Sequence, residues 1–321
     1  MNALSMPLVL EARRALDGRI RRTPIEPSPG LTEAAGAPVF LKLENLQLTG
    51  SFKIRGAFFS MSRLSADEKR GGIVTCSAGN HGKAVAYVSR ELGIPAEIHV
   101  PRTVDESKYQ GMLALGANVV RSRFDGFDDT ERLARAEAAR TGRPFLTAFD
   151  DAPILAANGG TLAAEVLEDC PSARVFLLPV GGAGLAGGFA EYAKAGLPAC
   201  RIVGCQHELS PALALSLERG EAVLTLPPVA TTAGGLEGGI GRTGFEALKT
   251  RIDGVALLTE EEIFEAVRFV LDRHQYLIEP SSAVTVAAIL TGKAGRIDAP
   301  AVAVISGRNV ALPTLQRILA E

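Results

Sequence analysis

The sequence predicts an α/β protein with parallel strands, divided into two lobes. Short runs of β-branched residues, such as IVTCS at 73–77, alternate with longer segments of helical periodicity, such as HGKAVAYVSRELG at 81–93. This alternation is typical of parallel sheets that are covered by helices. Hydrophobic residues fill 47% of the 321 positions, so the chain has enough apolar side chains to bury a large core.

Three consecutive strand–helix units are predicted in the first half of the chain. The expected strands are 73–77, 96–101 and 117–122, and the expected helices are 81–93, 106–116 and 128–142, the last capped by Asp128 or Asp129. Consecutive units of this kind form a compact block. We therefore expect a small domain at 70–148, inserted into a large domain made of 1–69 and 149–321.

The second half of the chain continues the same alternation. Its expected helices are 159–170, 185–196, 260–274 and 281–292, its strands are 174–180, 201–206 and 301–307, and a loop rich in glycine and threonine covers 231–244.

Charge and composition exclude several classes of function. The 34 basic and 36 acidic residues nearly balance and form no basic stripe, which argues against nucleic-acid binding. The four cysteines contain no CxxC pair and the four histidines are scattered, so no zinc site is expected. The N-terminus has no signal-peptide pattern, and no window reaches the roughly 18 apolar residues of a membrane span. We expect a cytoplasmic protein that does not bind membranes.

The glycine-rich segment LLPVGGAGLAGGFA, at 177–190, follows a predicted strand and opens a helix. Free amide groups beside a helix N-terminus form a site for a phosphate. Residues 182–187 also match GxGxxG, which is typical of nicotinamide-dinucleotide sites. Those sites carry an acidic residue about 20 positions later, where this chain has Gln206 and then Glu208. An anion site is favoured over a dinucleotide site and over close packing without a ligand.

Three further segments place polar residues at the ends of predicted strands: CSAGNHGKA at 76–84, YLIEPSSAV at 276–284 and AVAVISGRNV at 301–310. In open parallel sheets, ligands bind at the carboxyl ends of the strands. Each segment also has a simpler interpretation, because serine, asparagine and a glutamate before proline commonly cap helices.

Lys53, in TGSFKIRGA, is the candidate reactive group. Most lysines are solvated surface charges. Burial lowers the pKa of a lysine, and a neutral amine can form a Schiff base with an aldehyde. A phosphate site, one such lysine and polar groups at several strand ends are what pyridoxal phosphate requires.

At this level of detail the chain resembles the fold-type II pyridoxal-phosphate enzymes, in particular the threonine/serine dehydratase and serine racemase family. The resemblance spans nearly the whole chain and rests on five motifs in order: LKLENLQLTGSFKIRGA, SAGNHGKA, VGGAGLAGG, IEPSSA and SGRN. It implies the two-lobed, parallel-sheet fold of the tryptophan synthase β-subunit type. The large domain would bind the cofactor and the small domain the substrate.

The resemblance also assigns roles to individual residues. Lys53 would form the Schiff base and move the Cα proton. Cofactor contacts are expected from Phe52 against the ring, Asn80 at the ring 3-hydroxyl, Gly181, Gly182, Ala183, Gly184 and Leu185 around the phosphate, Ser306 at the ring nitrogen, and Gly235 and Glu279 on the other side of the cofactor. The substrate carboxylate would be held by Ser77, Gly79, Asn80 and His81.

The activity implied is an ammonia-lyase reaction, in which a small 3-hydroxy amino acid loses water and yields a 2-oxo acid and ammonia. A racemase on the same scaffold is an alternative, but racemases of the family have a serine where this chain has Ala78. Dehydratases of 3-hydroxyaspartate or of the hydroxyectoine pathway are further alternatives, since SGRN places Arg308 where SGGN is commoner.

Other expectations follow from the same resemblance. The acidic ligands of the family's divalent-cation site are replaced by Gln206 and Ala212, so no metal is expected. The chain ends soon after Ser306, which leaves no room for the regulatory domain of biosynthetic threonine dehydratases, and isoleucine feedback is not expected. A homodimer is implied.

Overall fold

The computed structural model describes residues 4–320 and contains two separate sheets. The larger sheet has the strand order β1-β2-β10-β7-β8-β9. Only β1 and β2 are antiparallel, and all other neighbours are parallel. Its strands are β1 (Ile25–Pro27), β2 (Val39–Leu43), β7 (Val175–Pro179), β8 (Arg201–His207), β9 (Gly254–Leu258) and β10 (Ala301–Ile305). A parallel sheet of this kind confirms the predicted α/β class.

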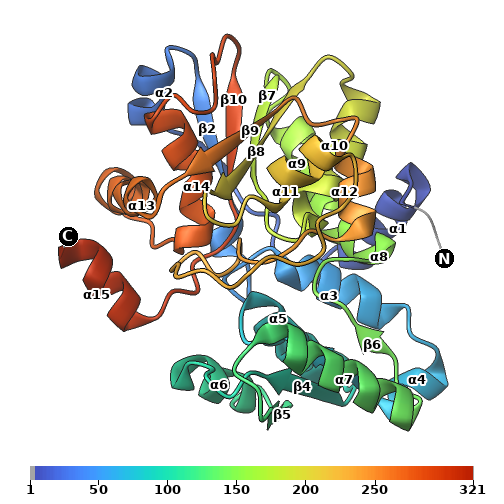
Figure 1. Cartoon of the computed structure of the whole chain (residues 1–321). Coiled ribbons are helices and arrows are strands. Elements are labelled where there is room, and N and C mark those ends of the chain that lie inside the picture. The colour runs from blue at the N-terminus through green and yellow to red at the C-terminus, as the bar shows by residue number, and fades with distance from the viewer. Residues whose placement is uncertain (1–3, 321) are drawn as a thin grey trace.

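Helices cover both faces of the larger sheet, as Figure 1 shows. One face is covered by α2 (Pro29–Ala35), α13 (Glu260–His274) and α14 (Pro280–Leu290), with α15 (Leu312–Ala320) beyond them; the other is covered by α9 (Thr161–Asp169), α10 (Gly184–Gly196), α11 (Ala212–Arg219) and α12 (Arg242–Leu248). Strand side chains alternate between the two cores, so Leu177 packs with α14 and Leu178 packs with α10. Strands buried on both faces explain the continuous apolar runs in the sequence.

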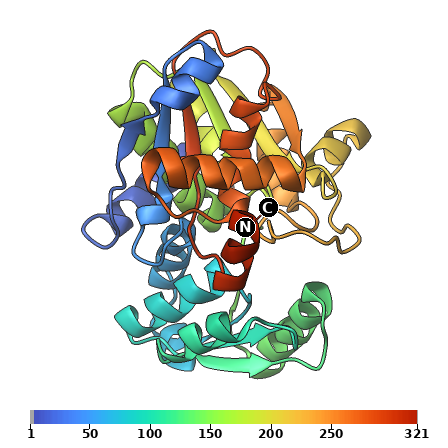
Figure 2. The same ribbon diagram turned by 90° about the vertical axis from the view of Figure 1, so that its left-hand side faces the viewer.

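The smaller sheet has the order β5-β4-β3-β6, and all of its strands are parallel. It forms the lower lobe in Figure 1, and Figure 2 shows the same lobe below the large sheet. Its elements are α4 (Ala66–Gly71), β3 (Ile73–Cys76), α5 (Asn80–Leu92), β4 (Ala96–Val100), α6 (Glu106–Leu113), β5 (Asn118–Arg121), α7 (Phe127–Thr141) and β6 (Phe145–Leu146).

The remaining elements lie between the sheets or beside the large one. They are α1 (Met6–Leu16), the 3₁₀ turn η1 (Glu44–Leu46), α3 (Lys53–Ser62), α8 (Ala152–Leu155) and the π-helical segment η2 (Ala156–Gly160). The sequence predicted a plain helix at 159–170, but α8, η2 and α9 form one longer unit. Gly159 has no room for a side chain, because a Cβ there would overlap the backbone of α10. The absence of a side chain at Gly159 therefore lets η2 and α10 approach closely.

The predicted cap of the helix at 128–142 is wrong. The helix begins at Phe127, its N-cap is Gly126, and no side chain caps it. Asp128 and Asp129 lie inside the first turn instead, where their negative charges interact favourably with the positive end of the helix. The remaining predicted elements of the smaller sheet shift by only a few residues.

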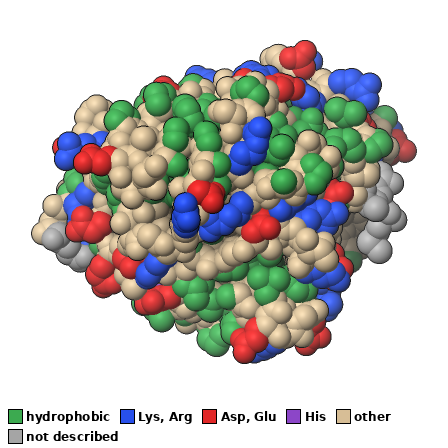
Figure 3. Space-filling view, turned by 90° about the horizontal axis from the view of Figure 1, so that it is seen from above, with side chains coloured by type: hydrophobic (Ala, Val, Ile, Leu, Met, Phe, Trp, Pro, Cys, Tyr) green, Lys and Arg blue, Asp and Glu red, His purple; other side chains and the backbone are tan. Residues whose placement is uncertain are grey.

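No helix within residues 4–320 is long and apolar enough to cross a membrane. The surface seen from above in Figure 3 mixes acidic, basic and apolar side chains without a region of one charge. This distribution agrees with the near-zero net charge of the sequence.

Candidate active site

Lys53 begins α3, at the junction between the two lobes. Its Nζ donates a hydrogen bond to the Ala148 carbonyl over 2.8 Å and lies 5.2 Å from the centre of the Phe52 ring. Burial lowers the pKa of the Lys53 amine to about 8, although the Glu279 carboxylate opposes this effect. An amine of this kind is partly neutral near physiological pH, which makes it a nucleophile and a base.

Glu279 precedes α14 of the large lobe and is buried. Its Oε1 accepts a hydrogen bond from Asn80 Nδ2 at 2.7 Å, and its Oε2 accepts one from the Asn309 amide at 3.1 Å. Burial raises the pKa of the Glu279 carboxyl to about 7, against the effect of the Asn80 bond. Gly307 is needed beside it, because a Cβ at that position would lie 2.8 Å from Oε1.

Asn80 and Asn309 extend this network between the lobes. Asn309 Nδ2 donates to Asn80 Oδ1 at 2.6 Å, and Lys83 Nζ donates to Asn309 Oδ1 at 2.7 Å. Burial and the nearby charge of Arg308 lower the pKa of the Lys83 amine. Two cations, Lys83 and Arg308, therefore lie close together beside the site.

The turn between β7 and α10 presents backbone amides to the site. Ala183 has a positive φ of 64° at the position before Gly184, the first residue of α10. Within the described residues, the amides of 181–185 have no acceptor in the protein. Gly181 and Gly182 cannot be larger here, since a Cβ would overlap the Gly235 carbonyl or the Phe149 ring, respectively. Leu185 and Gly184 are buried behind the turn.

Gly235 lies against Gly181 of the turn, and Ser306 lies beside Phe52. The Gly235 amide donates to Ser281 Oγ at 2.9 Å, which holds the 231–244 loop against α14. Ser306 Oγ lies 3.0 Å from Ser282 Oγ, and the Ser306 carbonyl accepts from the Phe52 amide at 3.1 Å. That last bond connects the end of β10 to the residue before Lys53.

The N-terminus of α5 offers a second set of free amides. Its N-cap is Gly79 and no side chain caps it, so the simple capping interpretation of Ser77 and Asn80 is not supported. Ser77 Oγ instead accepts a hydrogen bond from the Gly79 amide at 3.2 Å. The amides of Asn80 and His81 have no acceptor in the described part of the chain.

The His81 ring does not face the site. Its Nε2 lies 3.1 Å from Thr75 Oγ1, and Thr75 Oγ1 donates to the Leu146 carbonyl at 2.6 Å. Burial and the Lys53 charge lower the pKa of the His81 imidazole to about 3. A neutral, buried ring leaves only the His81 amide for a substrate carboxylate.

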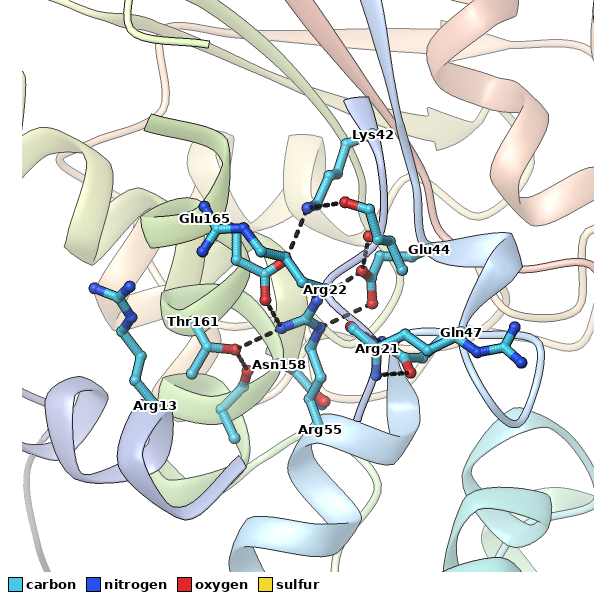
Figure 4. Close-up of polar contacts among 12 residues, drawn as sticks. Arg13, Arg21, Arg22, Lys42, Glu44, Gln47, Arg55, Asn158, Thr161 and Glu165 are labelled. Atoms are coloured by element: carbon cyan, nitrogen blue, oxygen red, sulfur yellow. Dashed lines mark hydrogen bonds and ion pairs between the residues drawn. The ribbon is translucent and has the colours of Figure 1, made fainter. Parts of the chain in front are cut away.

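A buried charged cluster behind Lys53 was not predicted from the sequence. Arg55, two residues after Lys53, forms hydrogen-bonded ion pairs with Glu44 at 2.7 Å and Glu165 at 2.7 Å, as Figure 4 shows. Lys42 Nζ donates to Glu165 Oε2 at 2.7 Å. Burial alone would lower the pKa of Arg55, but the two carboxylates hold it above its ordinary value.

This cluster connects η1, β2, α3 and α9. Its only signal in the sequence is the presence of charged residues, Lys42 in VFLKL and Arg55 in FKIRGAF, inside otherwise apolar runs.

Gln206, which replaces an acidic ligand of the family's divalent-cation site, is engaged in protein contacts. Gln206, fully buried, donates from Nε2 to the Val180 carbonyl at 3.1 Å and accepts from the Leu213 amide at 3.0 Å. No group of three His, Cys, Asp or Glu side chains that could hold a metal occurs in the part of the chain that the structure describes.

Comparisons with known proteins identify the family. A family model described as pyridoxal-phosphate-dependent enzyme matches residues 16–307. The chain belongs to this family. Curated relatives include an L-threonine ammonia-lyase of Thermotoga maritima, 36% identical over 97% of this chain and 77% of the relative, and the catabolic L-threonine dehydratase of Escherichia coli, 34% identical over 97% and 94%. The crystal structure of serine racemase from Dictyostelium discoideum superposes with a TM-score of 0.89 and 32% identity, covering 96% of this chain and 99% of that one.

The residues present fit this cofactor. The amides of 181–185 form a compact anion site, and Lys53 is a desolvated amine nearby. Two buried hydroxyls next to Lys53, those of Thr49 and Ser51, have no hydrogen-bond partner among the described residues. Buried polar groups are normally paired, so these two hydroxyls are available to a ligand. Among the same described residues, Asn45 Oδ1, Ser60 Oγ and His99 Nδ1 are unpaired as well. The predicted cofactor, pyridoxal phosphate, and the predicted family are confirmed.

Proposed function

We propose that this protein is a pyridoxal-phosphate-dependent ammonia-lyase of the threonine/serine dehydratase type. It would convert a small 3-hydroxy amino acid into a 2-oxo acid and ammonia by β-elimination of water. The observation that carries the proposal is the desolvated Lys53 amine, which bonds the Ala148 carbonyl and is influenced by the Glu279 charge. The similarity to an L-threonine ammonia-lyase and to a catabolic L-threonine dehydratase supports it.

The cofactor supplies an aldehyde that joins an amine and a ring that withdraws electrons from Cα, which makes the Cα proton acidic. We propose that Lys53 would hold the cofactor through its Nζ and that the same amine, once displaced by the amino group of the substrate, would carry the Cα proton. The amides of 181–185 would bind the phosphate, and Phe52, Gly235 and Glu279 would line the ring.

Other residues of the chain would orient the reacting groups. We propose that Asn80, whose Nδ2 has a second N–H beyond the bond to Glu279, contacts the ring hydroxyl. Ser306 would face the ring nitrogen with a hydroxyl, which does not keep that nitrogen protonated. The uncapped α5 N-terminus, with Ser77, Gly79 and the amides of Asn80 and His81, would bind the substrate carboxylate.

The test is release of 2-oxo acid from a panel of amino acids by the holoenzyme. L-Threonine should yield 2-oxobutanoate and L-serine pyruvate, each with one equivalent of ammonia. The proposal fails if the holoenzyme acts on none of the 3-hydroxy amino acids tested while its bound cofactor is intact.

A second candidate is a dehydratase of a substrate with an additional carboxylate, such as 3-hydroxyaspartate. Lys83 and Arg308 favour it, since both cations lie beside the proposed substrate site. Including 3-hydroxyaspartate and hydroxyectoine-derived compounds in the panel decides between the two.

Racemisation is the third candidate, supported by the similarity to a serine racemase. Ala78 stands where racemases of the family have a serine, so D-serine formation should be slow compared with elimination.

We also propose that the large domain (1–69 and 149–321) binds the cofactor and that the small domain (70–148) binds the substrate. The Asn80–Glu279 and Lys83–Asn309 contacts join these domains. A cytoplasmic homodimer is proposed from the family resemblance, and sedimentation of the purified holoenzyme would test the dimer.

A further inference from the structure

Gln206 makes side-chain contacts that link the proposed phosphate site to a neighbouring helix. It lies near the end of β8 and has no exposed surface. Its Nε2 donates to the Val180 carbonyl at 3.1 Å. Its Oε1 accepts two bonds from the first turn of α11, from the Leu213 amide at 3.0 Å and the Ala214 amide at 3.2 Å. The N-cap position of α11 itself supplies no side-chain bond, so Gln206 fills that role from a distance.

The Val180 carbonyl is part of the same peptide group as the Gly181 amide. In a trans peptide the C=O and N–H bonds point in opposite directions, and no cis peptide occurs in the described chain. Holding the carbonyl toward Gln206 therefore directs the Gly181 N–H the other way. That amide has no acceptor within residues 4–320 and belongs to the 181–185 turn.

The Val180–Gly181 peptide group is followed by glycines, whose backbone no side chain restricts. Gly181 and Gly182 must lack a Cβ to fit against Gly235 and Phe149, and glycine restricts the backbone less than any other residue. The β7–β8 ladder ends just before, with the Val180 amide donating to the Cys205 carbonyl at 2.9 Å. Gln206 therefore fixes the Val180–Gly181 peptide group after the ladder stops, whereas the Gly182 carbonyl is held by the Gly241 amide at 3.2 Å.

We infer that Gln206 is a positioning residue for the cofactor phosphate: its amide orients the Val180–Gly181 peptide group so that the Gly181 N–H points at the anion. This inference rests on the proposed phosphate site at 181–185. Gln206 acts through the backbone and does not itself touch the cofactor. Loss of its donor should weaken binding of ligands that carry the phosphate and leave other ligands unaffected.

The experiment compares two ligands of the apoenzyme, pyridoxal phosphate and pyridoxal, which lacks the phosphate. Gln206→Leu keeps the size of the side chain but loses the bond to Val180 and both bonds from α11. Only the bond to Val180 orients the Gly181 amide, so the Kd for pyridoxal phosphate should rise about tenfold, as expected for that one buried hydrogen bond. The Kd for pyridoxal should change less than about threefold. The control is Ser216→Ala, which removes a buried hydroxyl of α11 that accepts a hydrogen bond from the Val223 amide at 2.9 Å. This variant should change neither Kd.

A second variant, Gln206→Glu, gives a readout that a purely structural role would not produce. An ionised carboxylate still accepts from α11 but cannot donate to Val180, whereas a protonated carboxyl can do both. Its preference for pyridoxal phosphate over pyridoxal, relative to wild type at the same pH, should therefore recover as the pH falls. This variant decides the question if Gln206→Leu does not fold.

Three outcomes overturn the inference, and they are distinguishable. If wild type itself does not prefer pyridoxal phosphate to pyridoxal, the phosphate site at 181–185 is wrong. If wild type shows the preference and both Gln206 variants keep it at every pH, the site stands and the role of Gln206 is wrong. If the variants weaken both ligands equally, Gln206 supports the fold in general.

Discussion

Asn80 Nδ2 donates to Glu279 Oε1 over 2.7 Å, although 199 residues separate the two in the chain. One belongs to the first turn of α5 below the large sheet, and the other precedes α14, which packs on that sheet. The bond therefore joins the two lobes at the site, beside the Lys53 amine whose pKa Glu279 influences.

Replacement of Lys53 should abolish activity. In Lys53→Ala the proton-carrying amine and the covalent attachment are both lost, so we expect 2-oxo acid release to fall by about 10³-fold or more. Borohydride treatment of wild type should label the peptide containing Lys53, and absorption of the bound cofactor should change in the variant. Lys249→Ala, at an exposed lysine paired with Glu246, is the control and should keep full activity. A labelled peptide elsewhere in the chain would contradict the assignment.

Glu279 should make stability depend on pH in a defined direction. Its pKa in the folded chain, about 7, exceeds the ordinary value of 4.5. Between these two pH values the folded state holds a proton that the unfolded state has released. Such a group stabilises the fold below the unfolded pKa, and this contribution is lost as the pH rises through about 7. Between about pH 4.5 and 7.5, the free energy of unfolding of the apoenzyme should fall by up to about 3 kcal/mol more in wild type than in Glu279→Gln.

Denaturant titration at several pH values measures this difference. The Lys53 pKa is lowered to about 8. The contribution of Lys53 to the free energy of unfolding is therefore present above about pH 10.5 and is lost as the pH falls through about 8. Most of that change lies above the window chosen for Glu279. Parallel pH profiles of the two proteins would show that Glu279 is ionised throughout.

The buried cluster should be sensitive to loss of one charge. Glu165→Gln leaves Arg55 and Lys42 short of a carboxylate in a dry site, which should lower the free energy of unfolding by about 3–5 kcal/mol. Glu168→Gln, one turn later on the same helix, removes an exposed partner of Arg13 and should change it by less than about 1 kcal/mol. Equal effects of the two substitutions would show that the cluster is not desolvated.

Space at the 181–185 turn should be strictly limited. In Gly181→Ala the new Cβ would overlap the Gly235 carbonyl, so the turn must shift and cofactor affinity should fall by about tenfold or more. Gly234→Ala is the matched control, since nothing lies within 4 Å of the Cβ position there. Both are read from apoenzyme titration with pyridoxal phosphate, and similar affinities of the two variants would argue against a phosphate at this turn.

Metal removal should have no effect. The amide of Gln206 already satisfies both the Val180 carbonyl and the α11 amides, so a cation has neither a ligand set nor a role there. Dialysis against a chelator should leave the rate of 2-oxo acid release unchanged, and restoration of a lost rate by magnesium or calcium would refute this.

The α/β class, the glycine turn at 181–185 and the Lys53 motif, and hence the family and the cofactor, could be predicted from the amino-acid sequence. These features are local: each is a run of a few residues whose side-chain size or backbone freedom is specific to the structure it forms. The helix boundaries around 128 and 159 were less well predicted, because caps and a π-helical turn depend on which backbones lie nearby.

The tertiary structure alone decided which distant groups meet. The pairing of Asn80 with Glu279, the ion pairs of Arg55, the inward turn of the His81 ring and the contacts of Gln206 each join elements far apart in the chain. Their protonation and direction follow from burial and from partners on other strands. A local pattern does not identify these partners, since a charge in a short motif looks the same whichever distant group it meets.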